Sequence, residues 1–122
     1  MLAIGRPVKR KIESLDFERV VVSLISDGKA DEALRLLSLK FGVSVPKLKV
    51  GRAKGLVRVH GAYVRSKKTI YLSGREEFTD AFVILHEFYH HLRSLFGKHR
   101  GTEKSADRFV LDFLRKAYRP SD

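Results

Sequence analysis

His86-Glu87-Phe88-Tyr89-His90 is the stretch from which the rest of this chain can be interpreted. It lies within a run from Glu76 to Phe96 whose apolar residues recur every three or four positions. That spacing predicts a single helix with one buried face. On such a helix the side chains of His86 and His90 lie one turn apart on the same face, about 5–6 Å from each other.

The two histidines are well spaced for a metal ion. Two imidazole nitrogens can meet one zinc ion at about 2.0–2.1 Å each. Glu87 lies about 100° around the helix from His86, so its carboxylate can reach a water on the metal but is badly placed as a ligand. We therefore interpret His86 and His90 as candidate zinc ligands and Glu87 as the candidate general base of a hydrolase. The alternative is that all three are solvated side chains of an ordinary helix.

Two histidines leave a catalytic zinc one protein ligand short. Glu103 and Asp107 open a second predicted helix, which runs to about Tyr118, and they share the face opposite its apolar stripe. Alone, such a pair is typical of an acidic helix start, which the helix dipole favours. Downstream of the histidine pair, the same two carboxylates become candidates for completing a metal site.

HExxH followed by ExxxD on the next helix resembles the pattern of the gluzincins, the thermolysin-like zinc peptidases. The short spacing and small chain resemble the minimal archaeal minigluzincins and the related ImmA/IrrE-type peptidases, over roughly residues 63–113. This resemblance implies a zinc-dependent metallopeptidase, a hydrolase of peptide bonds. Position by position, it implies that His86, His90 and Glu103 hold Zn²⁺, that Glu87 is the catalytic base and acid, and that Asp107 orients a ligand histidine, which we expect to be His86.

Other zinc-peptidase patterns fit less well. The metzincin pattern fails, because Arg93 stands where its glycine should be and Phe96 where its third histidine should be. A family in which a third histidine follows the helix would make His99 the rival ligand to Glu103.

The other segments predict an α+β fold. Helices are expected over residues 14–27 and 31–41, a strand with Pro46 near a sheet edge over 43–50, and alternation continues over 56–60. A hairpin is expected from 61–65 and 69–72 around 66–68, and a capping box of Ser73 and Glu76 before the HExxH helix. We predict a zincin-like fold, a small mostly antiparallel sheet packed on the HExxH helix with flanking helices. The resemblance implies that a peptide substrate lies along an edge strand, either 61–65 or 69–72.

Composition indicates a single domain over residues 1–122 without cysteine, so any zinc is held by histidine and carboxylate. The absence of Asn and Gln beside abundant charge is expected of a hyperthermophile. No segment approaches 18 uncharged apolar residues, and the N-terminus lacks the apolar core of a signal peptide. We therefore expect a cytoplasmic protein that does not span a membrane.

The formal net charge is +11, and the basic residues are spread along the chain. This is typical of a solvated thermophile surface, and it also permits weak, non-specific nucleic-acid binding. The alternative function is accordingly a basic nucleic-acid-binding or regulatory protein whose zinc site is structural or inactive. Salt-sensitive DNA binding without peptide cleavage would favour that alternative.

The remaining histidines and the tyrosines are secondary candidates. His91 lies about 100° from His90 on the helix, so we expect it on the polar face or beside a ligand rather than on the metal. His60 is expected to be structural, or else to line the cleft. Four tyrosines are conceivable donors to an oxyanion: Tyr63, Tyr71, Tyr89 and Tyr118.

Overall fold

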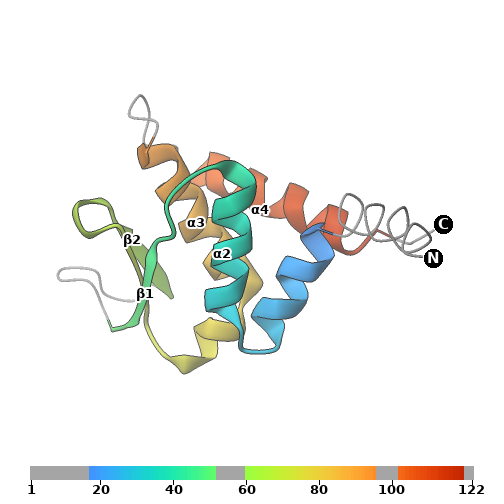
Figure 1. The fold of residues 1–122 in the computed structure, drawn as a ribbon, viewed down its shortest axis with the longest axis horizontal. Helices are drawn as coiled ribbons and strands as arrows, with labels where there is room; N and C mark the ends of the chain where they lie inside the picture. Colours follow the sequence, from blue (N-terminus) through green and yellow to red (C-terminus); the bar gives the residue numbers. More distant parts are fainter. Residues whose placement is uncertain (1–16, 52–59, 96–101, 120–122) are drawn as a thin grey trace, which may run out of the picture.

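A computed structural model describes residues 17–51, 60–95 and 102–119, and in them the chain combines helices with a small sheet (Figure 1). The expected α+β class is confirmed. In chain order the elements are a helix over residues 17–26, α2 (Ala30–Phe41), β1 (Lys47–Val50), β2 (Gly61–Val64), the 3₁₀ turn η1 (Arg65–Lys67), β3 (Thr69–Leu72), the 3₁₀ turn η2 (Arg75–Thr79), α3 (Ala81–Leu95) and α4 (Glu103–Ala117).

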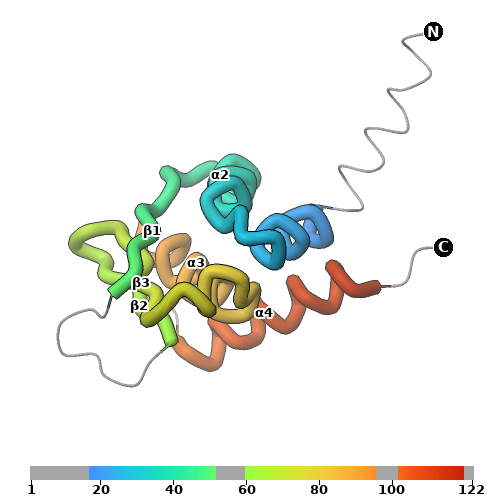
Figure 2. The backbone as a smooth tube through the Cα atoms, turned by 90° about the horizontal axis from the view of Figure 1, so that it is seen from below, coloured from blue at the N-terminus to red at the C-terminus, as the bar shows by residue number. Residues whose placement is uncertain are grey.

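The helix α3, which carries the HExxH stretch, lies at the centre of the fold (Figures 1 and 2). It packs against β2 and β3, against α2 and along α4. Its Ile84, Leu85 and Phe88 are fully buried and share one hydrophobic cluster with Ile70 and Leu72 of β3. Burying each such side chain stabilises the fold by roughly 1.5–3 kcal/mol, so the core fixes where this helix lies.

The sheet is mixed rather than mostly antiparallel. Its strand order is β1-β3-β2, with β3 in the centre. The expected hairpin is confirmed, because β2 and β3 pair antiparallel, but β1 pairs parallel with β3. The prediction was wrong on this point because apolar and polar residues alternate in the same way in both kinds of ladder. Of the two candidate edge strands, only β2 lies at an edge of the described sheet.

The first strand of the sheet, β1, is shorter than the sequence predicted. The predicted strand over residues 43–50 is a strand only from Lys47, directly after Pro46, and it lies at an edge as the proline indicated. Most of the alternating segment 56–60 lies outside the described residues.

The HExxH helix begins later than the sequence predicted. The residues from Arg75 to Thr79 form η2, and α3 starts only after Asp80. One Asp80 carboxylate oxygen accepts hydrogen bonds from the backbone N–H groups of Phe82, at 3.0 Å, and Val83, at 3.3 Å. It thereby satisfies two of the four free N–H groups at the helix start. Asp80, rather than Ser73, is therefore the cap of the motif helix.

The helix α4 follows its prediction closely. The Thr102 hydroxyl accepts a hydrogen bond from the Ser105 backbone N–H at 2.9 Å and caps the helix. Its buried face is Ala106, Val110, Phe113 and Ala117, which leaves Glu103 and Asp107 exposed. None of the helices in the described ranges is long and apolar enough to cross a lipid bilayer.

Candidate metal centre

Polar side chains of α3 and α4 face each other where the two helices run side by side. The Nε2 atom of His90 lies 2.6 Å from Oε1 of Glu103, and Nε2 of His86 lies 3.3 Å from the same oxygen. The Nδ1 atom of His86 lies 3.1 Å from Oδ1 of Asp107. The two helices are antiparallel, so the residue four positions before His90 on α3 faces the residue four positions after Glu103 on α4.

His86, His90 and Glu103 form the group of three that could hold a cation. One donor atom from each, an Nε2 or a carboxylate oxygen, lies within 4.8 Å of the other two. The fold therefore brings together the three residues expected to bind zinc, from helices separated in the sequence by residues 96–102. His99, the rival ligand, falls within that segment and lies outside the described residues.

The hydrogen bond that His86 donates to Asp107 determines which nitrogen of His86 is available to a metal. A carboxylate can only accept, so Nδ1 of His86 carries the proton that it donates to Asp107. Nε2 of His86 hydrogen-bonds to the Glu103 carboxylate at 3.3 Å, and with Nδ1 held by Asp107 it is the nitrogen that would give up its proton to bind a cation. This is the arrangement by which a carboxylate fixes the tautomer of a metal-ligating histidine.

The donor set fits zinc. Two imidazole nitrogens with one carboxylate oxygen match a known set of ligands for catalytic zinc. Zinc bonds of about 2.0–2.1 Å in tetrahedral geometry place two ligand atoms about 3.3 Å apart. The His86–Glu103 separation of 3.3 Å already has that value, while the His90–Glu103 separation of 2.6 Å is that of a direct hydrogen bond. Burial acts to raise the pKa of Glu103, but its hydrogen bond with His90 and the nearby histidine charges lower it overall. Glu103 is therefore ionised and available to a cation.

Glu87 lies beside the cluster but faces the sheet. Only 7% of its surface is exposed. Burial raises the pKa of its carboxyl above the ordinary value, against the opposing charges of His86 and His90 and a hydrogen bond from the Tyr63 backbone amide. A buried carboxylate with a raised pKa, within electrostatic range of the candidate ligands, has the properties that a general base requires.

Tyr63 of β2 contacts α3 through its side chain as well. Its hydroxyl lies 2.8 Å from Nδ1 of His91, and Nε2 of His91 lies 2.7 Å from the Ser44 backbone carbonyl. A carbonyl only accepts, so Nε2 carries the proton and the Tyr63 hydroxyl donates to Nδ1. Burial lowers the pKa of His91, in keeping with this neutral form.

His91 is therefore not on a polar face, as the sequence suggested, but fully buried. The sequence missed its partnership with Tyr63, although its place one turn after Glu87 on the helix was a signal that both residues face the same neighbour. Because its hydroxyl is bound to His91, Tyr63 is a poor candidate for an oxyanion donor. Tyr89 contacts a candidate ligand, with its ring centroid 5.8 Å from that of His90.

The close approach of β2 to α3 depends on Gly61. A Cβ atom at Gly61 would lie 2.8 Å from Cγ1 of Val83, which is closer than real contacts allow. Two residues along a strand span about 6–7 Å, which is the distance from Gly61 to Tyr63. Four residues along a helix span a similar distance, which is that from Val83 to Glu87. The strand therefore follows the helix, with Gly61 at Val83 and Tyr63 at Glu87.

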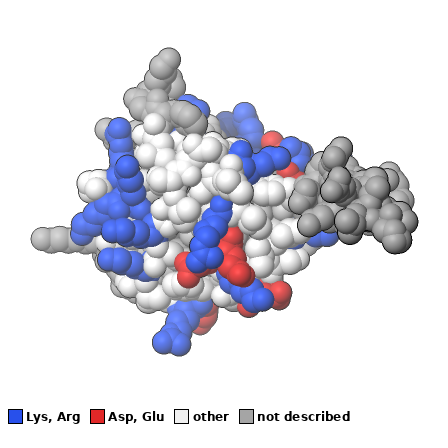
Figure 3. All heavy atoms as spheres, in the orientation of Figure 1, with Lys and Arg blue, Asp and Glu red and all other residues white. Residues whose placement is uncertain are grey.

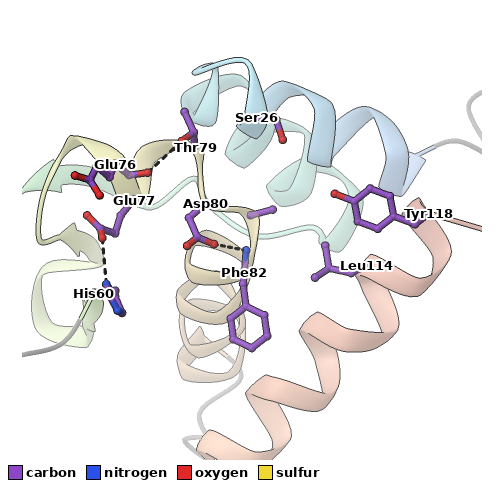
Figure 4. A pocket seen from close by; sticks show the side chains of 10 residues that line it. Ser26, His60, Glu76, Glu77, Thr79, Asp80, Phe82, Leu114 and Tyr118 are labelled. Carbon is purple, nitrogen blue, oxygen red and sulfur yellow. Dashed lines mark hydrogen bonds and ion pairs between the residues drawn. The ribbon is translucent and has the colours of Figure 1, made fainter.

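A groove of about 590 Å³ lies near the start of α3 (Figure 4). Its Phe82 stacks on His86, with ring centroids 6.3 Å apart and an angle of 25° between the rings, so the groove begins next to one of the candidate ligands. His60 lines it and is hydrogen-bonded to Glu77 at 3.1 Å. His60 is exposed and lines this groove, which is the second of the two places expected for it, and its role stays a prediction.

Comparison with known proteins adds no family to these observations. No protein-family model matches the chain, and no curated protein and no solved structure gives a significant match.

Proposed function

We propose that this protein is a zinc-dependent metallopeptidase with a zincin-like fold. The observation that carries the proposal is the convergence, within 4.8 Å, of Nε2 of His86 and Nε2 of His90 from α3 with a carboxylate oxygen of Glu103 from α4. Glu87 lies on α3 beside the two histidines. A solvated surface helix would not need a partner carboxylate from α4 at both histidines, nor Asp107 on the remaining nitrogen of His86.

In this proposal His86, His90 and Glu103 hold the metal. Bound zinc supplies a Lewis acid that polarises the scissile carbonyl and lowers the pKa of water to about 7. Asp107 keeps the proton on Nδ1 of His86, so that Nε2 always faces the cation.

Glu87 carries the proton transfers. Its carboxylate takes a proton from the attacking water and gives it to the leaving amine. The Tyr63 amide and the surrounding core hold this carboxylate in place and keep bulk water from it. The raised pKa of Glu87 makes it a stronger base than an exposed glutamate would be.

We assign β2 as the strand that takes the substrate backbone. The Ser73 backbone N–H donates to the His60 carbonyl at 2.9 Å, which makes that pair hydrogen-bonded. In an antiparallel ladder bonded pairs alternate, so the N–H and C=O groups of Gly61 and Tyr63 point away from β3. With the Tyr63 N–H bound to Glu87, the Gly61 groups and the Tyr63 carbonyl remain for an extended peptide, whose main-chain hydrogen bonds depend little on its sequence.

The test is Glu87→Gln, with zinc content and cleavage of an unstructured peptide measured together. We expect one zinc per chain and an unchanged circular dichroism spectrum, with turnover lower by roughly 10²–10⁴-fold. Glu32→Gln, on the exposed face of α2, is the matched control and should cleave like the unmodified protein.

Near-normal turnover in Glu87→Gln would exclude the proposed mechanism. An unmodified chain that holds no zinc would exclude the metal centre itself, and would favour the alternative of a basic binding protein.

A further inference from the structure

The net charge of the chain is confined to one stretch of sequence. Eleven of the 25 Lys and Arg residues lie between Ala33 and Arg75, and none of the 14 Asp and Glu residues does. The other 14 cations are balanced by the 14 acids, so this stretch alone accounts for the formal charge of +11. It contains all three strands of the sheet. A generally solvated surface would intersperse the two signs, so this segregation calls for a specific explanation.

The sheet has one buried and one open face. Ile70 and Leu72 of β3 are fully buried, and Leu48 and Tyr63 pack on the same core. Since side chains alternate along a strand, the opposite face carries the other residues in register with one another. These are Lys47 and Lys49 of β1, which are exposed, Tyr71 of β3 with Ala62 and Val64 of β2, which are half-buried, and Thr69 of β3, which is buried.

More cations border this open face at the β2–β3 hairpin. Arg65, Lys67 and Lys68 are exposed, and the Lys68 carbonyl accepts a hydrogen bond from the Lys47 backbone N–H at 2.9 Å. The start of β1 is thereby held beside the hairpin. We call Lys47, Lys49, Arg65, Lys67, Lys68 and Tyr71 the basic sheet surface.

The cations of this surface have no acidic partners. Within the described parts of the chain, none of the five forms an ion pair with a carboxylate. In Figure 3, Lys and Arg gather at the left, over the sheet end of the molecule, and the Asp and Glu seen on that face lie nearer the helices. Positive charges held close together without counter-charges attract a polyanion.

The chemistry of the open face favours nucleic acid over a lipid surface. Membrane-binding surfaces insert apolar side chains next to their cations. In the described sheet, the large hydrophobic residue that is exposed is Val50. Val50 follows Lys49 directly on β1, so its side chain lies on the other face of the sheet. Beside the cations lies instead Tyr71, which is half-buried and directly opposite Lys49 in the ladder. An aromatic ring next to cations is the combination by which sheets bind unpaired bases and their phosphates.

We propose that the basic sheet surface binds single-stranded nucleic acid, with the lysines and arginine on phosphates and the Tyr71 ring stacked on a base. In the parts of the chain that the structure describes, this face is formed by strands and the η1 turn, with no α-helix to enter a duplex groove, so unpaired bases are the form that can reach Tyr71. This proposal does not depend on the metal centre, since its residues lie outside that cluster.

The experiment is a fluorescence anisotropy titration of the intact chain with an oligothymidine of about 15 nucleotides, within the usual site size of such proteins. Lys47→Gln with Lys49→Gln should weaken binding by roughly tenfold or more and lower the slope of log affinity against log salt by about 1.4. Tyr71→Leu should weaken it by roughly 5- to 100-fold with little change of slope. Thermal melting checks that each variant is folded.

The matched control removes the same two charges elsewhere, as Lys29→Gln with Lys116→Gln, both exposed. An affinity close to that of the unmodified chain in this control supports the proposal. Equal losses in the two double variants would overturn it, because binding would then follow net charge alone. It would also be overturned if the Tyr71 variant binds normally, if a duplex of the same length binds more tightly, or if anionic lipid vesicles are bound and oligothymidine is not.

Discussion

Glu103 and His99 are the two candidates for the third ligand of the proposed zinc site, and the geometry around His86 and His90 favours Glu103. Its Oε1 atom is in contact with Nε2 of both histidines. The Thr102 cap and the buried face of α4 fix the turn from which it extends. A ligand from an element that the core already holds needs little ordering when the metal binds.

We therefore expect Glu103→Ala to lose most of the zinc affinity. Asp107→Ala should weaken binding by roughly 10–100-fold, because Nδ1 of His86 then loses the acceptor that fixes its tautomer. His99→Ala should leave the zinc content intact. Competition with a chelator of known affinity measures all three. Loss of zinc in His99→Ala with retention in Glu103→Ala would instead indicate a three-histidine site.

His91 shows how burial fixes the charge state of a residue. It makes two hydrogen bonds as a neutral imidazole inside the core, and burial lowers its pKa below the ordinary value of 6.5. The folded state thus binds a proton at His91 less readily than the unfolded chain. The stabilisation from neutral His91 is fully present above a pH of about 6.5, and is lost as the pH falls towards the lower folded pKa.

We expect His91→Gln to lower the free energy of unfolding at neutral or higher pH by about 1–3 kcal/mol, because the Tyr63 hydroxyl and the Ser44 carbonyl lose their partner. The difference from the unmodified chain should shrink as the pH falls below about 6.5, since only the unmodified chain pays the protonation cost. Urea unfolding at a series of pH values measures it. A difference that grows in acid would contradict the neutral form.

At the scale of elements, the distance between β2 and α3 decides whether the Tyr63 amide reaches Glu87. Gly61 permits this distance because it has no Cβ, not because its backbone is unusual. Two residues of β2 span about the same length as four residues of α3. A displacement of the strand at Gly61 therefore also displaces Tyr63 relative to Glu87.

Gly61→Ala should therefore destabilise the fold by about 1–3 kcal/mol, the usual cost of overpacking. Its new methyl group meets Cγ1 of Val83 first, so adding Val83→Ala should recover part of the loss. Urea unfolding of the two variants and of Val83→Ala alone separates the effects. If Gly61→Ala is as stable as the unmodified chain, β2 is not held against α3 as closely as the structure shows.

At the scale of the whole molecule, the proposed metal links the two helices α3 and α4, which residues 96–102 connect in the sequence. A ligand that binds the folded state alone stabilises it by about 2.7 kcal/mol at a hundredfold excess over its Kd. For a domain of this size that corresponds to a rise in Tm of roughly 10 °C.

We expect zinc to raise the Tm by about this amount, and a chelator to reverse the change. His90→Ala is the control, because it removes one ligand while leaving the core of α3 in place. An equal rise in His90→Ala would show that zinc binds elsewhere on the molecule, and no rise in either protein would exclude a metal link between α3 and α4.

The sequence by itself determined the local features. The spacing of apolar residues predicted α2 and α4 and the central part of α3, and the hairpin of β2 with β3 followed from alternation around a turn. The HExxH and ExxxD spacings also predicted which side chains share a helix face. These features depend on residues within one or two turns of each other, so the sequence contains the information directly.

Only the tertiary structure decided the rest. The parallel pairing of β1 with β3, the burial of His91 between Tyr63 and Ser44, and the approach of Gly61 to Val83 all join residues far apart in the chain. The alternation of apolar and polar residues is the same in parallel and antiparallel ladders. The sequence of a helix does not show which distant residues will pack over one of its histidines. The antiparallel packing of α3 on α4, which brings Glu103 to His86 and His90, likewise arises from the shared core rather than from the motif.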